Sequence, residues 1–271
     1  MKHIQYLGDD NMPLYSSTLG EGPSIIILHG GGPDRQSIIP FAKLLKNDYQ
    51  VVFPDIRGYG ESICLDRDKH NWQQYARDVI SLMDHLDLKK TVICGMGLGS
   101  SIAERVAYSN PERVQATILI SPETFDNDGE GSSKKEIELM NKCGEMAIQG
   151  GLEAAWNPFM GNLAPVIQSM VRAAFPRTDP RSFSAAMAIV HSQRLASWKQ
   201  LSGIISPTLI IPGNDPRHNT DTGQQYLKFI PNATLGTGID WQHIHTVDEL
   251  AAAIIPQMKV FLKTLPFSHD R

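Results

Sequence analysis

Short, continuously apolar segments that alternate with amphipathic segments most constrain the fold of this chain. Four of the apolar segments occur in the first 120 residues, at 24–29, 50–54, 91–94 and 116–120. Their apolar residues follow one another without alternation, which is typical of strands that are covered on both faces. Between them, apolar residues recur at helical spacing, as in 72–86 and 98–106. The alternation predicts an α/β fold in which helices cover both faces of a parallel sheet.

The pattern changes after Ser121. Residues 122–205 contain no convincing strand and consist mainly of helical segments rich in Met and Trp. Strand character then returns in two further segments, at 207–211 and 233–235. We therefore predict a sheet domain formed by 1–121 and 206–271, into which 122–205 inserts as a helical cap.

Charge and cysteine content exclude several classes of protein. The 25 Lys and Arg against 29 Asp and Glu give a net charge of −4 without a basic stripe, which argues against nucleic acid as a partner. The apolar segments are too short to span a membrane, and the N-terminus becomes polar too early for a signal peptide. Three cysteines without a CxxC pair fit a reducing cytoplasm. We expect a cytoplasmic protein with a small-molecule ligand, and the sequence leaves the oligomeric state open.

Functional residues are expected in the loops that follow the strands, because ligands of open α/β sheets bind beyond the carboxyl ends of the strands. The loop at 29–34 contains three glycines, whose bare amides can approach a ligand closely. The loop at 55–62 suits a structural turn with an internal pair of Asp55 and Arg57. In the third loop, glycines at every second position from 95 to 99 allow a sharp turn into a helix. A dinucleotide fingerprint would need glycine at position 100, where the chain has Ser100.

The combination of these motifs resembles the α/β-hydrolase superfamily. The residues that carry the resemblance are HGGGPD at 29–34, DIRGYGES at 55–62, GMGLG at 95–99 and NPERV at 110–114. The resemblance extends over about residues 25–265. Within the superfamily, the chain is similar to the esterase, lactonase and peptidase branches that carry a helical cap. It implies a mostly parallel, eight-stranded sheet and a hydrolase-like protein that acts on or binds a small ester, lactone or amide-type carbonyl compound.

The resemblance also implies where a catalytic triad would lie, and the triad is degenerate. The family presents a nucleophilic Ser at the centre of G-x-S-x-G, whereas this chain has Gly97 there. The implied acid is Asp215, and the implied base is His243, which has Asp248 five residues on; His245 is the weaker candidate for the base.

Further site residues follow from the same resemblance. The amides of Gly31 and Leu98 would form an oxyanion hole, and Met96, Gly32 and Trp156 would contact the substrate. Three alternative nucleophiles lie near the turn, but we expect structural roles for all of them: Ser100, Ser101 and Cys94. His243 and His245 have the i, i+2 spacing of two metal ligands, and His218 is the candidate that could approach them in space. No third ligand has a convincing spacing along the chain, so we expect no metal or other cofactor.

Three hypotheses for function remain. In the first, His243 oriented by Asp215 acts as a general base on water or on an acidic substrate proton, with no serine nucleophile. In the second, the protein is a catalytically inactive sensor or binding protein for a small carbonyl ligand. In the third, Gly97 is an engineered substitution in an active serine hydrolase.

Overall fold

The computed structural model describes residues 1–124, 132–195, 197–214, 218 and 220–267. Eight strands form one sheet in the order β1-β2-β4-β3-β5-β6-β7-β8. Their bounds are β1 Lys2–Leu7, β2 Pro13–Leu19, β3 Ser24–Leu28, β4 Gln50–Pro54, β5 Thr91–Met96, β6 Val114–Ile120, β7 Thr208–Ile211 and β8 Ala233–Leu235. The strands from β4 to β8 along this order run parallel, and β1 and β2 add an antiparallel edge. The predicted α/β fold with a mostly parallel, eight-stranded sheet is confirmed.

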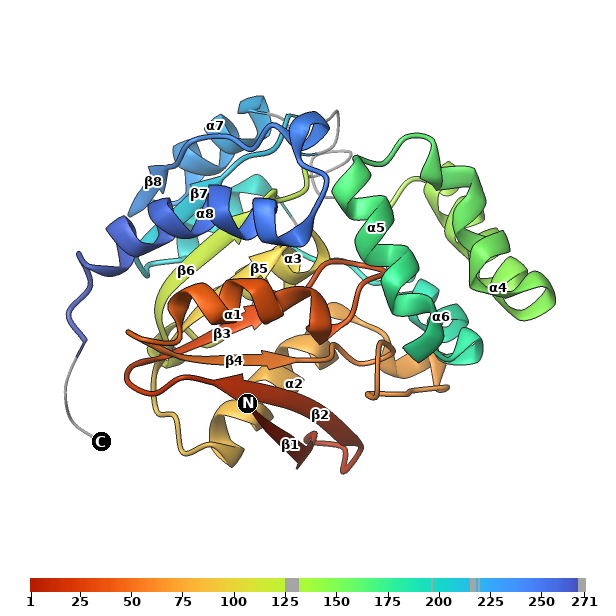
Figure 1. Cartoon of the computed structure of the whole chain (residues 1–271), viewed down its shortest axis with the longest axis horizontal. Coiled ribbons are helices and arrows are strands. Elements are labelled where there is room, and N and C mark those ends of the chain that lie inside the picture. The colour runs from red at the N-terminus through yellow and green to blue at the C-terminus, as the bar shows by residue number, and fades with distance from the viewer. Residues whose placement is uncertain (125–131, 196, 215–217, 219, 268–271) are drawn as a thin grey trace.

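Helices cover both faces of the sheet, as Figure 1 shows. Their bounds are α1 Ile39–Leu45, α2 Trp72–His85, α3 Leu98–Ser109, α4 Lys134–Met160, α5 Pro165–Ala174, α6 Pro180–Ala186, α7 Thr220–Phe229 and α8 Val247–Leu262. One apolar core joins the sheet to α1 and α8, and the other joins it to α2 and α3. The continuously apolar strands form where both of their faces contact a core, as their sequence predicts.

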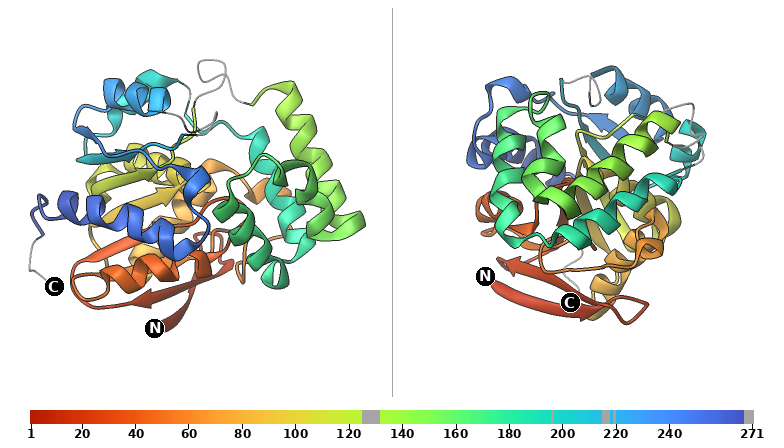
Figure 2. Two further views of the ribbon diagram at one scale, coloured as in Figure 1. Left: turned by 45° about the horizontal axis from the view of Figure 1, so that its top comes forward. Right: turned by 90° about the vertical axis from the view of Figure 1, so that its right-hand side faces the viewer.

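The helices α4, α5 and α6 come between β6 and β7 in the chain and lie beside one end of the sheet (Figures 1 and 2). Helix α4 contains a break at Gly151, where φ is +79°. These helices occupy the segment that the sequence assigns to a cap, and the domain boundaries at 121/122 and 205/206 stay a prediction. None of the described helices combines the length and apolar character needed to cross a membrane.

Candidate active site

The turn between β5 and α3 has the strained geometry that the G-x-G-x-G pattern predicts. Gly97 at its tip has φ +51° and ψ −114°, a conformation that L-residues rarely adopt. Its amide donates to the carbonyl of Ile120 over 3.0 Å, which fixes the tip against β6. A Cβ built at Gly97 would meet no atom of the described residues within 4 Å, whereas one at Gly95 would lie 2.0 Å from the Gly99 carbonyl oxygen. Gly95 is therefore required by packing, and Gly97 only by its backbone conformation.

The amides of Gly31 and Leu98 lie on neighbouring segments, as the predicted oxyanion hole requires. A Cβ built on Gly31 would lie 3.8 Å from Leu98 Cβ. Leu98 is the first residue of α3, so its amide has no acceptor inside the helix. The N-terminal end of a helix also carries a partial positive charge, which favours a negatively charged oxygen. The arrangement is suited to polarising a carbonyl group.

A buried histidine holds the glycine loop in place. Ile56 donates its amide to His29 Nε2 over 3.0 Å, so the ring proton is on Nδ1, which lies 2.7 Å from the Gly30 carbonyl oxygen. Burial lowers the pKa of His29, so the ring is neutral. His29 is thus a structural part of the site. At the other end of the loop, Asp34 forms an ion pair with Arg177 over 2.5 Å.

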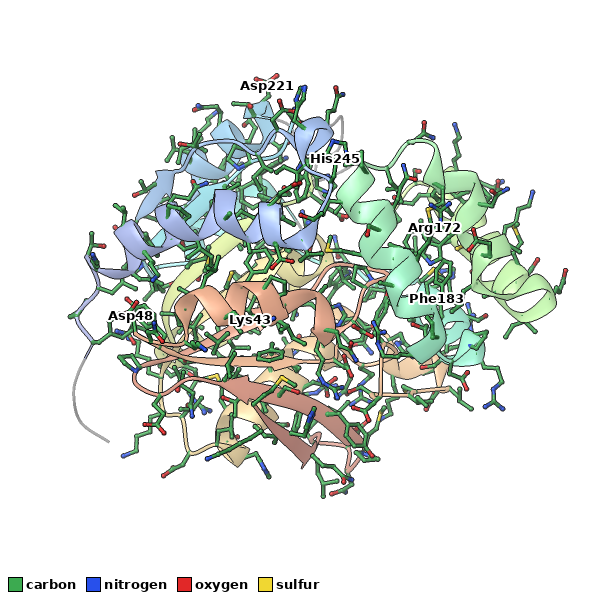
Figure 3. The ribbon with its side chains drawn as sticks, viewed as in Figure 1. Lys43, Asp48, Arg172, Phe183, Asp221 and His245 are labelled. Atoms are coloured by element: carbon green, nitrogen blue, oxygen red, sulfur yellow. The ribbon has the colours of Figure 1, made fainter. Side chains whose placement is uncertain are left out.

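Gly32 and Trp156, two of the residues predicted to contact the substrate, lie next to each other. Gly32 has φ +97°, and a Cβ there would lie 2.5 Å from Trp156 Cζ2. The indole of Trp156 in α4 also packs against Phe183, a residue of α6 that Figure 3 labels. Met96 is 5% exposed and packs into the core on the α1 and α8 side. A role of these residues in binding substrate stays a prediction.

The alternative nucleophiles have structural roles in the part of the chain that the structure describes. Ser100 Oγ donates to the Gly95 carbonyl over 2.7 Å, and Ser101 Oγ accepts from Arg194 over 2.8 Å. Cys94 is fully buried, and desolvation raises the pKa of its thiol far above the usual value. None of these groups is placed to replace a nucleophile at Gly97.

The loop at 55–62 is structural, but its predicted internal ion pair is wrong. Asp55 pairs with the guanidinium of Arg35 and also accepts the Arg35 amide over 2.8 Å. Arg57 is fully buried and instead binds Asp78 over 2.7 Å and Asp10 over 3.0 Å. Pairing within the loop fails because the two side chains contact different elements of the fold.

Arg57 also accounts for an acidic cluster. Asp9, Asp10 and Asp78 are close enough to hold a metal ion in principle. However, the Arg57 guanidinium already neutralises Asp10 and Asp78. We assign the cluster to stability.

His243 lies in the short helix η8, Trp241–His243, between β8 and α8. Its Nδ1 lies 2.6 Å from Asp240 Oδ2, and Asn214 Nδ2 donates to Asp240 Oδ1 over 2.8 Å. The hydrogen bond with His243 lowers the pKa of Asp240. Asp215 lies outside the described residues, so its pairing with His243 stays a prediction. Sequence reasoning missed Asp240, for which the sequence offers only its position three residues before His243 as a signal.

The side chain of His243 is 82% exposed, which differs from the enclosed base that a triad would provide. It lines a groove of about 430 Å³ whose described lining residues are Thr237, Gly238, Ile239, Asp240, His243, Ile244, Ala253, Pro256 and Gln257. These belong to α8 and to the loop before it, and neither Gly97 nor Gly31 is among them. The placement of His243 over Gly97 therefore stays a prediction that this groove does not support.

The weaker candidate, His245, lies in the same loop, near the place where η8 contacts α5 (Figure 3). Its amide donates to Glu249 Oε2 over 2.8 Å, next to the capping box of α8. The backbone of His245 therefore has a clear role in starting α8.

Comparison with known proteins defines the class. The model of the family described as "Alpha/beta hydrolase family" matches residues 25–253, and the chain belongs to this family. It is 26% identical over 267 residues to a 2-hydroxy-6-oxononadienedioate/2-hydroxy-6-oxononatrienedioate hydrolase of Comamonas testosteroni, covering 91% of this chain and 92% of the relative. It is also 25% identical over 244 residues to a putative esterase/lipase of Haemophilus influenzae, covering 86% of this chain and 82% of the relative.

Two solved structures share the fold over nearly their whole length. The enol-lactonase from Burkholderia xenovorans has a TM-score of 0.80 at 21% identity and covers 96% of this chain and 100% of its own. The bottromycin epimerase BotH, solved in complex with bottromycin A2, has a TM-score of 0.73 at 20% identity and covers 98% of this chain and 100% of its own. At these identities the likeness establishes the fold.

Proposed function

We propose that this chain binds a small ester, lactone or amide-type carbonyl compound and acts on it without a covalent intermediate. The observation that carries the proposal is the turn at Gly97, which keeps the strained geometry and open space of a nucleophile turn but has no side chain to attack. The carbonyl oxygen would accept from the amides of Gly31 and Leu98, and its carbon would lie above Gly97.

General-base catalysis is the chemistry that remains when the nucleophile is absent. A carboxylate that is hydrogen-bonded to Nδ1 of His243 leaves Nε2 free to accept a proton. Asp240 supplies that carboxylate here. The proton would come from water that attacks the carbonyl, or from the carbon next to it. An oxyanion hole and binding alone supply on the order of 10³-fold acceleration over water. We therefore expect slow turnover.

Relatives support both versions of this chemistry. The names of the hydrolases and of the enol-lactonase denote cleavage of a carbonyl-containing compound. The name of the epimerase denotes inversion of a stereocentre, a reaction in which a proton can leave and return without acyl transfer. We favour hydrolysis because the curated relatives cover most of the chain.

A second candidate function is binding without catalysis. It is favoured by the 82% exposure of the His243 side chain and by its place in a groove that does not include Gly97. A binding protein would be stabilised against heat by a small carbonyl ligand and would show no turnover.

The test compares the wild type with two variants on p-nitrophenyl butyrate. We expect His243→Ala to lose turnover, while His245→Ala, which removes a neighbouring imidazole, retains it. A fluorophosphonate probe should leave the wild type unlabelled, because Gly97 provides no hydroxyl. Unchanged turnover in His243→Ala would remove this residue from the mechanism, and stoichiometric labelling of the wild type would overturn the role of Gly97.

A further inference from the structure

Ser121 lies next to the turn at Gly97, at the end of the neighbouring strand β6. The last paired residues of β5 and β6 are Met96 and Ile120, so the next residues along these parallel strands are Gly97 and Ser121. The amide of Ser121 donates to the Ile211 carbonyl over 2.7 Å, which places it between the end of β5 and the end of β7. This is the edge of the sheet where ligands of such folds bind.

Two properties of Ser121 are unfavourable for folding. Its φ is +48°, which is strained for a residue other than glycine. Its side chain is buried, with the residue 3% exposed, and its hydroxyl has no hydrogen-bond partner among the described residues. A glycine at this position would avoid both the strained backbone and the unpaired hydroxyl. The fold alone therefore gives no reason for a serine here, whereas strained residues and unpaired buried groups are typical of functional sites.

A second buried donor without a partner lies at the same edge. The indole Nε1 of Trp241 has no acceptor among the described residues, and a Cβ on Gly213, just after β7, would lie 2.5 Å from it. Ser121 contacts the end of β7 through Ile211, so both unpaired groups flank this strand end. The edge thus offers hydrogen bonds that the described part of the protein does not use.

We propose that Ser121 determines specificity by binding a second oxygen of the carbonyl ligand, carried on the β-carbon. This rests on the proposed function, which places the carbonyl carbon above Gly97. Residues in register on adjacent strands are about 4.8 Å apart. In an extended β-hydroxy or β-keto acyl compound, the oxygen on the β-carbon is three bonds from the carbonyl carbon, so a carbonyl carbon above Gly97 brings this oxygen toward Ser121. Rotation about the Cα–Cβ bond of Ser121 moves its hydroxyl between staggered positions, so it can turn toward such a ligand.

Two probes that differ by one hydroxyl test the proposal: methyl 3-hydroxybutyrate and methyl butyrate. Their dissociation constants would be measured by saturation-transfer NMR on the wild type and on Ser121→Ala and Ser121→Gly. We expect the wild type to bind the hydroxy ester about tenfold more tightly, which is the worth of one hydrogen bond to a buried group. Both variants should bind the two esters equally.

Thr18 provides the matched control, because its hydroxyl on β2 is also buried and unpaired within the described residues. Thr18→Val should leave both dissociation constants unchanged. In addition, Ser121→Gly should melt at a higher temperature than the wild type, because it relieves the backbone strain while losing the preference for the hydroxy ester.

Each outcome has a distinct meaning. If the wild type binds both esters equally, or if Ser121→Ala keeps the tenfold preference, the role of Ser121 is refuted while the proposed carbonyl site stands. If the wild type binds neither ester, the proposed carbonyl site is refuted, and the role of Ser121 with it.

Discussion

Replacing Gly97 by serine tests the geometry of the turn directly. A Cβ at this position meets no atom of the described residues within 4 Å, so we expect no steric overlap from the substitution. The cost is backbone strain at φ +51° and ψ −114°, which we estimate at about 2 kcal/mol of unfolding free energy. For a chain of this size that corresponds to a decrease of roughly 4 °C in melting temperature. Scanning calorimetry or a thermal melt would measure it.

The matched control is Gly151→Ser in α4. Gly151 also has a positive φ, +79°, and open space around its Cβ position, but it lies in another part of the fold. We expect a similar loss of stability in both variants and fluorophosphonate labelling only in Gly97→Ser. By contrast, Gly95→Ser should fail to fold stably, because its Cβ would lie 2.0 Å from a backbone oxygen.

Two results would refute this reasoning in different ways. Failure of Gly97→Ser to fold, while Gly151→Ser folds, would show that the space above the turn is filled. A folded Gly97→Ser protein that stays unlabelled would show that a base and the amides of Gly31 and Leu98 do not converge on residue 97, which contradicts the proposed function.

Two further predictions concern stability. Gly32→Ala should lower the free energy of unfolding by about 3 kcal/mol, because the φ of +97° strains alanine and the new Cβ would overlap Trp156. The control is Gly161→Ala, where the Cβ has open space, and it should change this free energy by less than about 1 kcal/mol. Urea titrations would measure both values. Burial lowers the pKa of His70 to about 4. The neutral ring accepts a hydrogen bond from the Tyr75 hydroxyl and donates one to the Cys64 carbonyl. The unfolded chain, with a His pKa of about 6.5, binds this proton more readily, so stability present above pH 6.5 should fall by about 3 kcal/mol as the pH drops toward 4. Urea titrations between pH 4 and 8 would show this, and in His70→Gln the fall across this window should be smaller; an equal fall would contradict the assignment to His70.

The strands from β3 to β8 and the position of the turn could be predicted from the sequence because they depend on local patterns. Continuous apolar runs indicate strands covered on both faces, and alternating glycines predict a sharp turn into α3. The edge strands β1 and β2 were missed because β1 is mostly exposed and because the consecutive buried residues of β2 are polar: Ser16, Ser17 and Thr18. Such a pattern is weak over six or seven residues.

The interactions at the site were harder to predict. The predicted pair of Asp55 and Arg57 does not form, because Arg35 approaches Asp55 from another loop. Asp240 as the partner of His243 depends on how η8 follows β8. Spacing along the chain indicates which residues are near in sequence but not which way their side chains turn.

The sequence by itself determined that the chain builds an α/β-hydrolase fold and that no side chain projects from the centre of its nucleophile turn. Both follow from residue identity: apolar runs require burial, and glycine has no side chain. Only the tertiary structure decided that space remains above Gly97, that the Gly31 loop meets the start of α3, and that Ser121 is strained beside them. These properties depend on the packing of segments distant in the sequence, since a distance or an unpaired hydroxyl exists only when all neighbours are in place.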